Sequence, residues 1–132
     1  MTRNPLHFAP TSHTRARGNQ AEHTAVRWLK NQGFRILERN HRNRAGEIDV
    51  IALDGETLCF IEVKARAGST AGPAIEAVHL RKQMRLARAA SVYLASSGWE
   101  GPCRFDVLGL DRAGDDQTGT WTFTLIEDAF SM

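Results

Sequence analysis

Residues 46–66 constrain the fold of this chain more than any other segment. Two apolar runs, about residues 47–53 and 57–65, are joined through Asp54-Gly55, a dipeptide typical of hairpin turns. Both runs are apolar at successive positions rather than at every second one, which is the pattern of strands covered on both faces. The segment therefore predicts a β-hairpin of two central strands.

Three ionisable side chains interrupt these apolar strands: Asp49, Glu62 and Lys64. Ionised groups inside a sheet cost on the order of several kcal/mol unless a partner or a metal neutralises them, so the pattern indicates a site. Two carboxylates, with the Val63 carbonyl as a further oxygen ligand, suit Mg²⁺ or Mn²⁺. The Lys64 amine can orient or deprotonate water, or stabilise a phosphate. We therefore predict metal-assisted attack of water on a phosphodiester; the alternative for Glu62 and Lys64 is a simple salt bridge at a strand end.

The register of the hairpin decides whether the two acids can meet. A two-residue turn at Asp54-Gly55, or a four-residue loop, places Asp49 and Glu62 on one face of the sheet. A regular three-residue loop sends them to opposite faces unless a bulge intervenes. Lys64 follows Glu62 by two positions and shares its face. We expect the two carboxylates to face the same side on adjacent antiparallel strands.

The rest of the chain predicts an α/β domain. Residues 1–15 contain Pro5 and Pro10 and no apolar period, which predicts a flexible N-terminal arm before a single domain over residues 16–132. A first helix is expected to end at Gly33, and a second to run over residues 73–97. Further strands are expected over residues 34–37, 104–110 and 121–126.

Length and composition limit the class of protein. A chain of 132 residues that is 42% apolar can bury one good core. It has no apolar run long enough to span a membrane and no apolar signal-peptide core, so a cytoplasmic location without membrane attachment is expected. Cys59 and Cys103 lack the spacing of a metal motif, which favours buried free thiols over a disulfide or a zinc site.

Charge is unevenly distributed along the chain. Residues 1–46 hold nine Arg or Lys against two Glu, whereas residues 47–66 hold five acids against two bases. A basic surface around a carboxylate site suits a protein that binds nucleic acid, and a solvated surface of uneven charge is the alternative. The candidate nucleic-acid-binding residues are Arg42, Arg44, Arg66, Arg81, Lys82, Arg85 and Arg88.

Several short motifs together resemble a known family. They are Asn40, Arg42, Gly46-Glu47-Ile48-Asp49, Phe60-Ile61-Glu62-Val63-Lys64, Arg66, Lys82 and Arg104-Phe105-Asp106-Val107. Asp49 followed by Glu62-Val63-Lys64 resembles the signature of the PD-(D/E)XK nucleases, the restriction-endonuclease-like superfamily that includes archaeal Holliday-junction resolvases. The whole set, over residues 18–130, is similar to the bacterial YraN family of that superfamily, whose cellular role is unsettled.

The resemblance implies a restriction-endonuclease-like core, in which a central mixed β-sheet is flanked by α-helices. It implies a divalent metal at Asp49 and Glu62, with Lys64 as a catalytic partner. It also implicates Glu22 as catalytic, because a Gly-Glu pair opens the first helix in the family; this chain has Ala21-Glu22 at that place. A solvated helix carboxylate is the alternative for Glu22.

Two functions follow as hypotheses. The first is a metal-dependent DNA endonuclease, selective for branched or single-stranded DNA. The second is a non-catalytic module on a nuclease fold that binds nucleic acid or a protein, since folds often outlast their chemistry. Symmetric cleavage of a four-way junction would require a homodimer, for which the expected edge strand with Trp121, Phe123 and Leu125 is a candidate surface.

Overall fold

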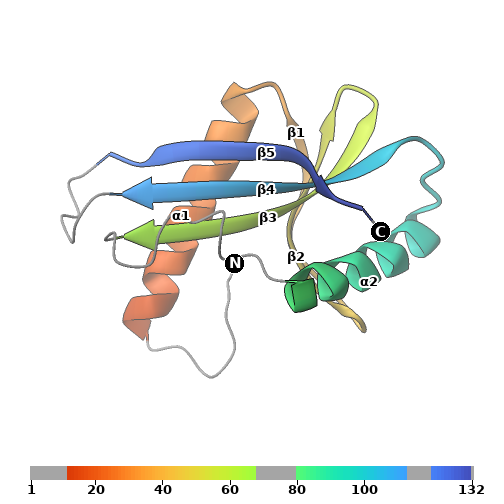
Figure 1. Cartoon of the computed structure of the whole chain (residues 1–132), viewed down its shortest axis with the longest axis horizontal. Coiled ribbons are helices and arrows are strands. Elements are labelled where there is room, and N and C mark those ends of the chain that lie inside the picture. The colour runs from red at the N-terminus through yellow and green to blue at the C-terminus, as the bar shows by residue number, and fades with distance from the viewer. Residues whose placement is uncertain (1–11, 68–79, 113–119, 132) are drawn as a thin grey trace.

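Two helices and five strands make up the parts of the chain that the computed structural model describes, residues 12–67, 80–112 and 120–131. In chain order they are α1 (Ser12–Asn31), β1 (Arg35–Asn43), β2 (Gly46–Asp54), β3 (Thr57–Ala67), α2 (Leu80–Ser97), β4 (Cys103–Arg112) and β5 (Thr122–Phe130) (Figure 1).

The strands form one mixed sheet in the order β1-β2-β3-β4-β5. Neighbouring strands are antiparallel except β3 and β4, which are parallel and are connected through α2. The sequence-based prediction of an α/β fold with a central mixed sheet and flanking helices is confirmed, and the predicted hairpin is β2 and β3.

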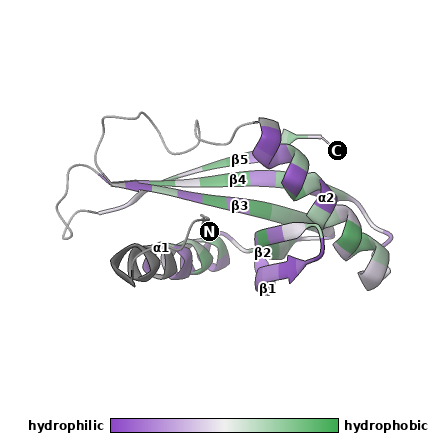
Figure 2. Ribbon diagram, turned by 90° about the horizontal axis from the view of Figure 1, so that it is seen from below, coloured by the Kyte–Doolittle hydropathy of each residue, from purple (hydrophilic) through white to green (hydrophobic). Residues whose placement is uncertain are grey.

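The two helices cover opposite faces of the sheet. On β3, Cys59, Ile61 and Val63 belong to the apolar cluster that packs against α1, whereas Leu58 and Phe60 belong to the cluster that packs against α2. Figure 2 shows α1 lying to one side of the ribbon formed by β3, β4 and β5. Because both faces are covered, the central strands are apolar at successive positions, as their sequence indicates.

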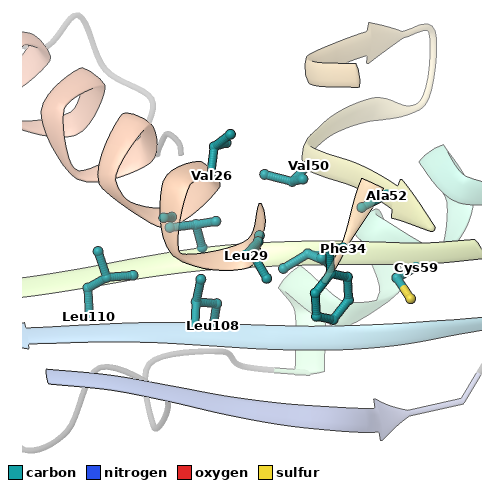
Figure 3. Close-up of a cluster of buried hydrophobic side chains, with 11 residues drawn as sticks. Val26, Leu29, Phe34, Val50, Ala52, Cys59, Leu108 and Leu110 are labelled. Carbon is teal, nitrogen blue, oxygen red and sulfur yellow. The ribbon is translucent and has the colours of Figure 1, made fainter. Parts of the chain in front are cut away.

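The cluster under α1 is the larger of the two (Figure 3). Val26 and Leu29 of α1 pack there with residues of β2, β3 and β4, and Trp28 stacks on Phe123 of β5 with ring centroids 5.1 Å apart. Trp121 and Leu125 also pack against this cluster. Trp121, Phe123 and Leu125, which were considered above as a dimer surface, therefore pack against the core of the same chain.

The end of α1 follows a common local pattern. Gly33 has φ of 101° and its N–H donates to the Lys30 carbonyl, while the Phe34 N–H donates to the Leu29 carbonyl, both at 3.0 Å. This is a Schellman cap, in which glycine takes the left-handed position at low cost. It directs buried Phe34 into the core and starts β1 at Arg35.

Several predicted boundaries were wrong. Helix α1 begins at Ser12, inside the segment predicted as an arm, and residues 1–11 lie outside the described residues. Strand β1 continues to Asn43 instead of ending near residue 37, because it is an edge strand with mostly exposed side chains and lacks an apolar signal. The predicted start of the second helix also lies outside the described residues.

The two cysteines differ from each other. Both are free thiols, as predicted, but only Cys59 is buried; Cys103 is exposed at the start of β4, so the prediction of burial was wrong for it.

Candidate active site

The charged residues of the hairpin lie where β2 separates from β3. Backbone pairing between these strands runs from Asp54 with Thr57 to Val50 with Ile61, so the next positions along the two strands are Asp49 and Glu62. This is the register of the four-residue loop considered above. Just beyond the last pair, the Val63 N–H donates to Oδ2 of Asp49 at 2.8 Å. The Asp49 side chain thus lies against the β3 backbone beside Glu62.

Strand β2 turns as it leaves β3. Val50 packs in the cluster under α1, but Ile48, two residues earlier, packs in the cluster under α2. In a regular strand these two side chains would share a face. Residues 46–48, on the N-terminal side of this turn, are paired with β1 alone. Here the two strands run beside α2 (Figure 1).

Glu62 faces α2 and meets a lysine from that helix. Phe60, two residues earlier on β3, packs under α2, and Oε2 of Glu62 lies 2.6 Å from Nζ of Lys82. Residues 20 positions apart in the chain therefore meet at the site. The sequence grouped Lys82 with the other cations of this helix as a nucleic-acid-binding residue. In the structure its amine contacts the buried carboxylate of Glu62.

Electrostatic repulsion acts between the two carboxylates. Both are buried, with Asp49 5% and Glu62 3% exposed. Burial first, and then the charge of Asp49, raise the pKa of Glu62 to about 8, although Lys82 and Lys64 act in the opposite direction. A carboxylate that is so poorly solvated favours either a proton or a further cation.

Lys64 is the third member of this group. Burial first, and then the neighbouring Lys82, lower the pKa of Lys64 to about 8, while Glu62 and Asp49 oppose this shift. A perturbed lysine amine beside two carboxylates is typical of functional sites, because it can exchange a proton near neutral pH. The structure thus brings together Asp49, Glu62 and Lys64, as the sequence predicted.

Glu22 reaches the site region through β1. Its side chain is 2% exposed on α1, and its Oε1 accepts a hydrogen bond of 2.6 Å from Nδ2 of Asn40. Asn40 lies between Arg39 and His41, which pair with Val50 and Ile48, so it lies beside Asp49 in the sheet. Glu22 is therefore not the solvated helix carboxylate of the alternative reading.

The donor set fits a hard divalent cation. The two carboxylates offer oxygen ligands, and their mutual repulsion would be relieved by positive charge. Within the described residues, no group of three or more His, Cys, Asp or Glu is arranged to hold a metal ion. The protein would thus supply the oxygens of Asp49 and Glu62, and water or substrate the remainder, as is common for Mg²⁺. The predicted use of the Val63 carbonyl stays a prediction; the structure assigns a role only to the Val63 N–H.

Comparison with known proteins places the chain in a family. The family model described as "Uncharacterised protein family UPF0102" matches residues 21–110. The chain belongs to the UPF0102 family. UPF0102 is the YraN family, a group with a PD-(D/E)XK nuclease-like fold, so the resemblance drawn from the sequence is confirmed.

Curated UPF0102 proteins from several bacteria are similar to this chain over most of their length. A UPF0102 protein of Chlorobium chlorochromatii (strain CaD3) is 48% identical over 123 residues, which are 92% of this chain and 95% of the relative. One from Chlorobium phaeobacteroides (strain BS1) is 52% identical over 94 residues, 70% and 75% of the two chains. One from Symbiobacterium thermophilum is 48% identical over 114 residues, 86% and 94% of the two chains. None of these names states an activity.

The remaining predicted cations of this UPF0102 protein lie on β1, on the β1–β2 turn, on β3 and on α2. The β1–β2 turn contacts α2 directly, since Nδ2 of Asn43 donates to the Ala89 carbonyl at 3.0 Å. Arg42 is exposed and lies 3.2 Å from Glu47, and Arg66 is partly buried on β3. The other exposed cations are Arg44 in the turn and Arg81, Arg85 and Arg88 on α2. In the helices that the structure describes, no segment is both long and apolar enough to cross a membrane.

Two features of the site were missed from the sequence. Asn40 was noted only as part of the family pattern, but its φ of 53° and its bond to Glu22 give it a structural role. A non-glycine residue with positive φ is uncommon, and asparagine is among the types that tolerate it, which is the only local signal. The contact of Lys82 with Glu62 has no signal in sequence spacing.

The raised pKa of Glu62 makes the stability of the metal-free protein depend on pH. Because the folded state keeps the Glu62 proton up to about pH 8 and the unfolded state releases it near pH 4.5, Glu62 stabilises the fold fully only below pH 4.5 and loses that contribution as pH rises through 8. Glu62→Gln removes this dependence. We expect the free energy of unfolding of the variant, minus that of the wild type, to increase by about 1–3 kcal/mol between pH 5 and pH 8.

Urea unfolding at both pH values in the presence of a chelator measures this difference. Glu56→Gln, at an exposed residue of the β2–β3 turn, is the matched control and should show a constant difference. An equally constant difference for Glu62→Gln would mean that the Glu62 pKa is not raised in the folded protein.

Proposed function

We propose that this UPF0102 protein is a metal-dependent nuclease that hydrolyses phosphodiester bonds in DNA. The observation that carries the proposal is the meeting of Asp49, Glu62 and Lys64 in a buried group at the point where β2 separates from β3. Asp49 and Glu62 repel each other although two lysines lie nearby, and a divalent cation would relieve that repulsion.

Each residue has a distinct part in this proposal. Asp49 and Glu62 hold Mg²⁺ or Mn²⁺, which would supply charge neutralisation and activation of water. The Val63 N–H fixes the Asp49 carboxylate through one oxygen. Lys64, whose pKa of about 8 lets it exchange a proton, accepts a proton from the attacking water or neutralises the phosphate oxygen that gains charge. Glu22 and Asn40 position β1 beside Asp49.

Nucleic acid as the substrate is supported by the cations near this group. Arg81, Arg85 and Arg88 are exposed on the helix that also carries Lys82, and the turn with Arg44 lies against that helix. Guanidinium groups suit phosphate because they donate bidentate hydrogen bonds. Branched or single-stranded DNA is the proposed substrate class by its relation to the junction-resolving nucleases named above.

The test is a titration of Mg²⁺ and Mn²⁺ on a panel of linear, nicked, flapped, single-stranded and four-way DNA. We expect cleavage of at least one substrate with either metal and none in the presence of a chelator. Light scattering with and without the four-way junction reports whether the protein acts as a monomer or as the homodimer that symmetric cleavage requires. Absence of cleavage on all substrates with both metals would contradict the proposal.

One observation favours a second function. The ion pair between Lys82 and Glu62 already neutralises one of the carboxylates without a metal, as expected for a site that keeps its fold but has no turnover. Such a protein would bind DNA without cutting it. Binding of the same panel at equal affinity with and without metal, and no cleavage, would identify this function.

Salt dependence tests whether DNA lies on the basic surface. Each phosphate contact releases counterions, so the logarithm of the binding constant should fall with the logarithm of salt concentration by about 0.9 per contact on duplex DNA. We expect the double substitution of Arg85 and Arg88 by Gln to reduce this slope by about two contacts. Arg35→Gln, at an exposed residue at the far end of β1, should leave the slope unchanged. A slope near zero in the wild type would point to a protein partner.

A further inference from the structure

We propose that Lys82 is an internal counterion that holds Glu62 in the metal-free protein and must leave it when a divalent cation binds, which frees the amine for a substrate phosphate. This inference rests on the proposed function, because it assigns a role to Lys82 in metal loading. This role differs from direct binding of nucleic acid, because Lys82 would act on Glu62 before any substrate is present.

The placement of Lys82 sets it apart from the other cations of α2. Its side chain is 27% exposed and its Nζ lies 2.6 Å from Oε2 of Glu62, well within the distance of an ion pair. Arg81, Arg85 and Arg88 on the same helix are exposed. Lys82 is therefore the cation of this helix that turns inward to the carboxylates.

The charges of the site explain why the lysine must move. With Asp49, Glu62, Lys64 and Lys82 all ionised, the group has no net charge, and a proton on Glu62 makes its net charge +1. A divalent cation held by the two carboxylates would add two positive charges beside the Lys82 ammonium, which lies 2.6 Å from Oε2 of Glu62. If the Lys82 ammonium leaves and a negatively charged phosphate then binds, the net charge of the site returns to zero.

Lys82, and not Lys64, is the amine that can leave. Lys64 is on β3, where its backbone is paired with Gly109 of β4, so the start of its side chain is fixed. Lys82 is on a surface helix and has a flexible four-carbon stem that can carry the ammonium to solvent. Once outside, it lies on the same helix turn as Arg81 and Arg85, where a phosphate backbone would pass.

One oxygen of each carboxylate already has a contact: Oδ2 of Asp49 accepts the Val63 N–H, and Oε2 of Glu62 lies 2.6 Å from Nζ of Lys82. A metal that binds Glu62 would bring its positive charge close to the Lys82 ammonium, so the two cations compete for this carboxylate. Removal of the Lys82 charge should strengthen metal binding, whereas removal of a cation that merely lies nearby should have a small effect.

Isothermal titration calorimetry with Mn²⁺ alone, without DNA, tests the competition. We expect Lys82→Gln to bind Mn²⁺ about tenfold more tightly than the wild type. Arg81→Gln is the matched control: it removes one positive charge from the adjacent position of α2, and should change the affinity by less than about threefold. Lys82→Arg keeps the charge and should bind no more tightly than the wild type.

Thermal unfolding is a second readout that does not depend on DNA. The metal-free Lys82→Gln variant should melt at a lower temperature than Arg81→Gln, because buried Glu62 loses its partner, and Mn²⁺ should raise its melting temperature by more than that of the wild type. Equal Mn²⁺ affinity in Lys82→Gln and Arg81→Gln would overturn the role of Lys82 but leave the nuclease proposal standing. If neither the wild type nor the variants bind Mn²⁺, both this role and the metal-dependent function are overturned.

Discussion

Substitution of Asp49 by Asn is expected to reduce metal-dependent DNA cleavage by about 10³-fold or more, while the protein stays folded. The loss follows because the amide can no longer offer a charged oxygen to a divalent cation, on which activation of water depends. The fold should persist because the amide oxygen can still accept the Val63 N–H that now bonds to Oδ2. The substitution also removes the charge that helps to raise the pKa of Glu62.

Initial rates on the best substrate of the panel measure this effect. Lys64→Ala should reduce cleavage to a similar extent but retain Mn²⁺ binding, since the amine is not a metal ligand. Asp128→Asn is the matched control, because it makes the same change at an exposed residue of β5 whose φ of 53° suits asparagine. Wild-type rates in Asp49→Asn would show that the observed nuclease is a contaminant or that its site lies elsewhere.

The largest effect on stability is expected at Arg104. This residue lies on the face of the sheet that α1 covers, where its Nε is 2.9 Å from Oδ1 of Asp106 and its Nη2 is 2.9 Å from Oδ2 of Asp54. Asp106 is completely buried. Burial opposes the charge of Arg104, but its hydrogen bonds to Asp106 and Asp54 outweigh burial and raise the arginine pKa. Arg104→Ala removes this partner of Asp106, which still accepts the Asp128 N–H at Oδ1.

We expect Arg104→Ala to lower the free energy of unfolding by about 3–5 kcal/mol, the usual cost of leaving a buried charge without its partner. Urea or thermal unfolding measures this loss. Arg42→Ala is the control, since it removes an arginine from an exposed ion pair with Glu47 and should cost less than about 1 kcal/mol. Similar losses for the two variants would show that the contacts of Arg104 with Asp106 and Asp54 do not stabilise the fold.

The hairpin could be predicted from the sequence because its signals are local. Apolar strands and Asp54-Gly55 define it, and the three charged residues within it define a site. Its register could not be settled in this way: Asp54 pairs with Thr57 and leaves Gly55 and Glu56 in the turn, with φ of 62° at Gly55. This two-residue turn is shifted by one position from the predicted Asp54-Gly55 turn and gives the register of the predicted four-residue loop, a choice for which the sequence offers no signal.

The contacts that complete the site could not be predicted, because they join distant parts of the chain. Lys82 reaches Glu62 only because α2 crosses the face of the sheet on which Phe60 packs. Glu22 reaches Asn40 only because β1, an exposed edge strand with a weak sequence signal, extends beyond residue 37. Helical spacing alone groups Lys82 with the exposed arginines of α2. Only the tertiary contact with Glu62 distinguishes it from them.

The parallel pairing of β3 with β4 has a consequence for the order in which the site is assembled. Strands β1, β2 and β3 are joined by short turns, so their ends meet at little cost in chain entropy, whereas β4 can join β3 only after the long segment that includes α2 has returned across the sheet. Asp49 and Glu62 belong to the early part, and Lys82 to the late one. We therefore expect a newly made chain to bring its two carboxylates together before the lysine that neutralises them arrives, so that a dissolved cation can reach the pair first.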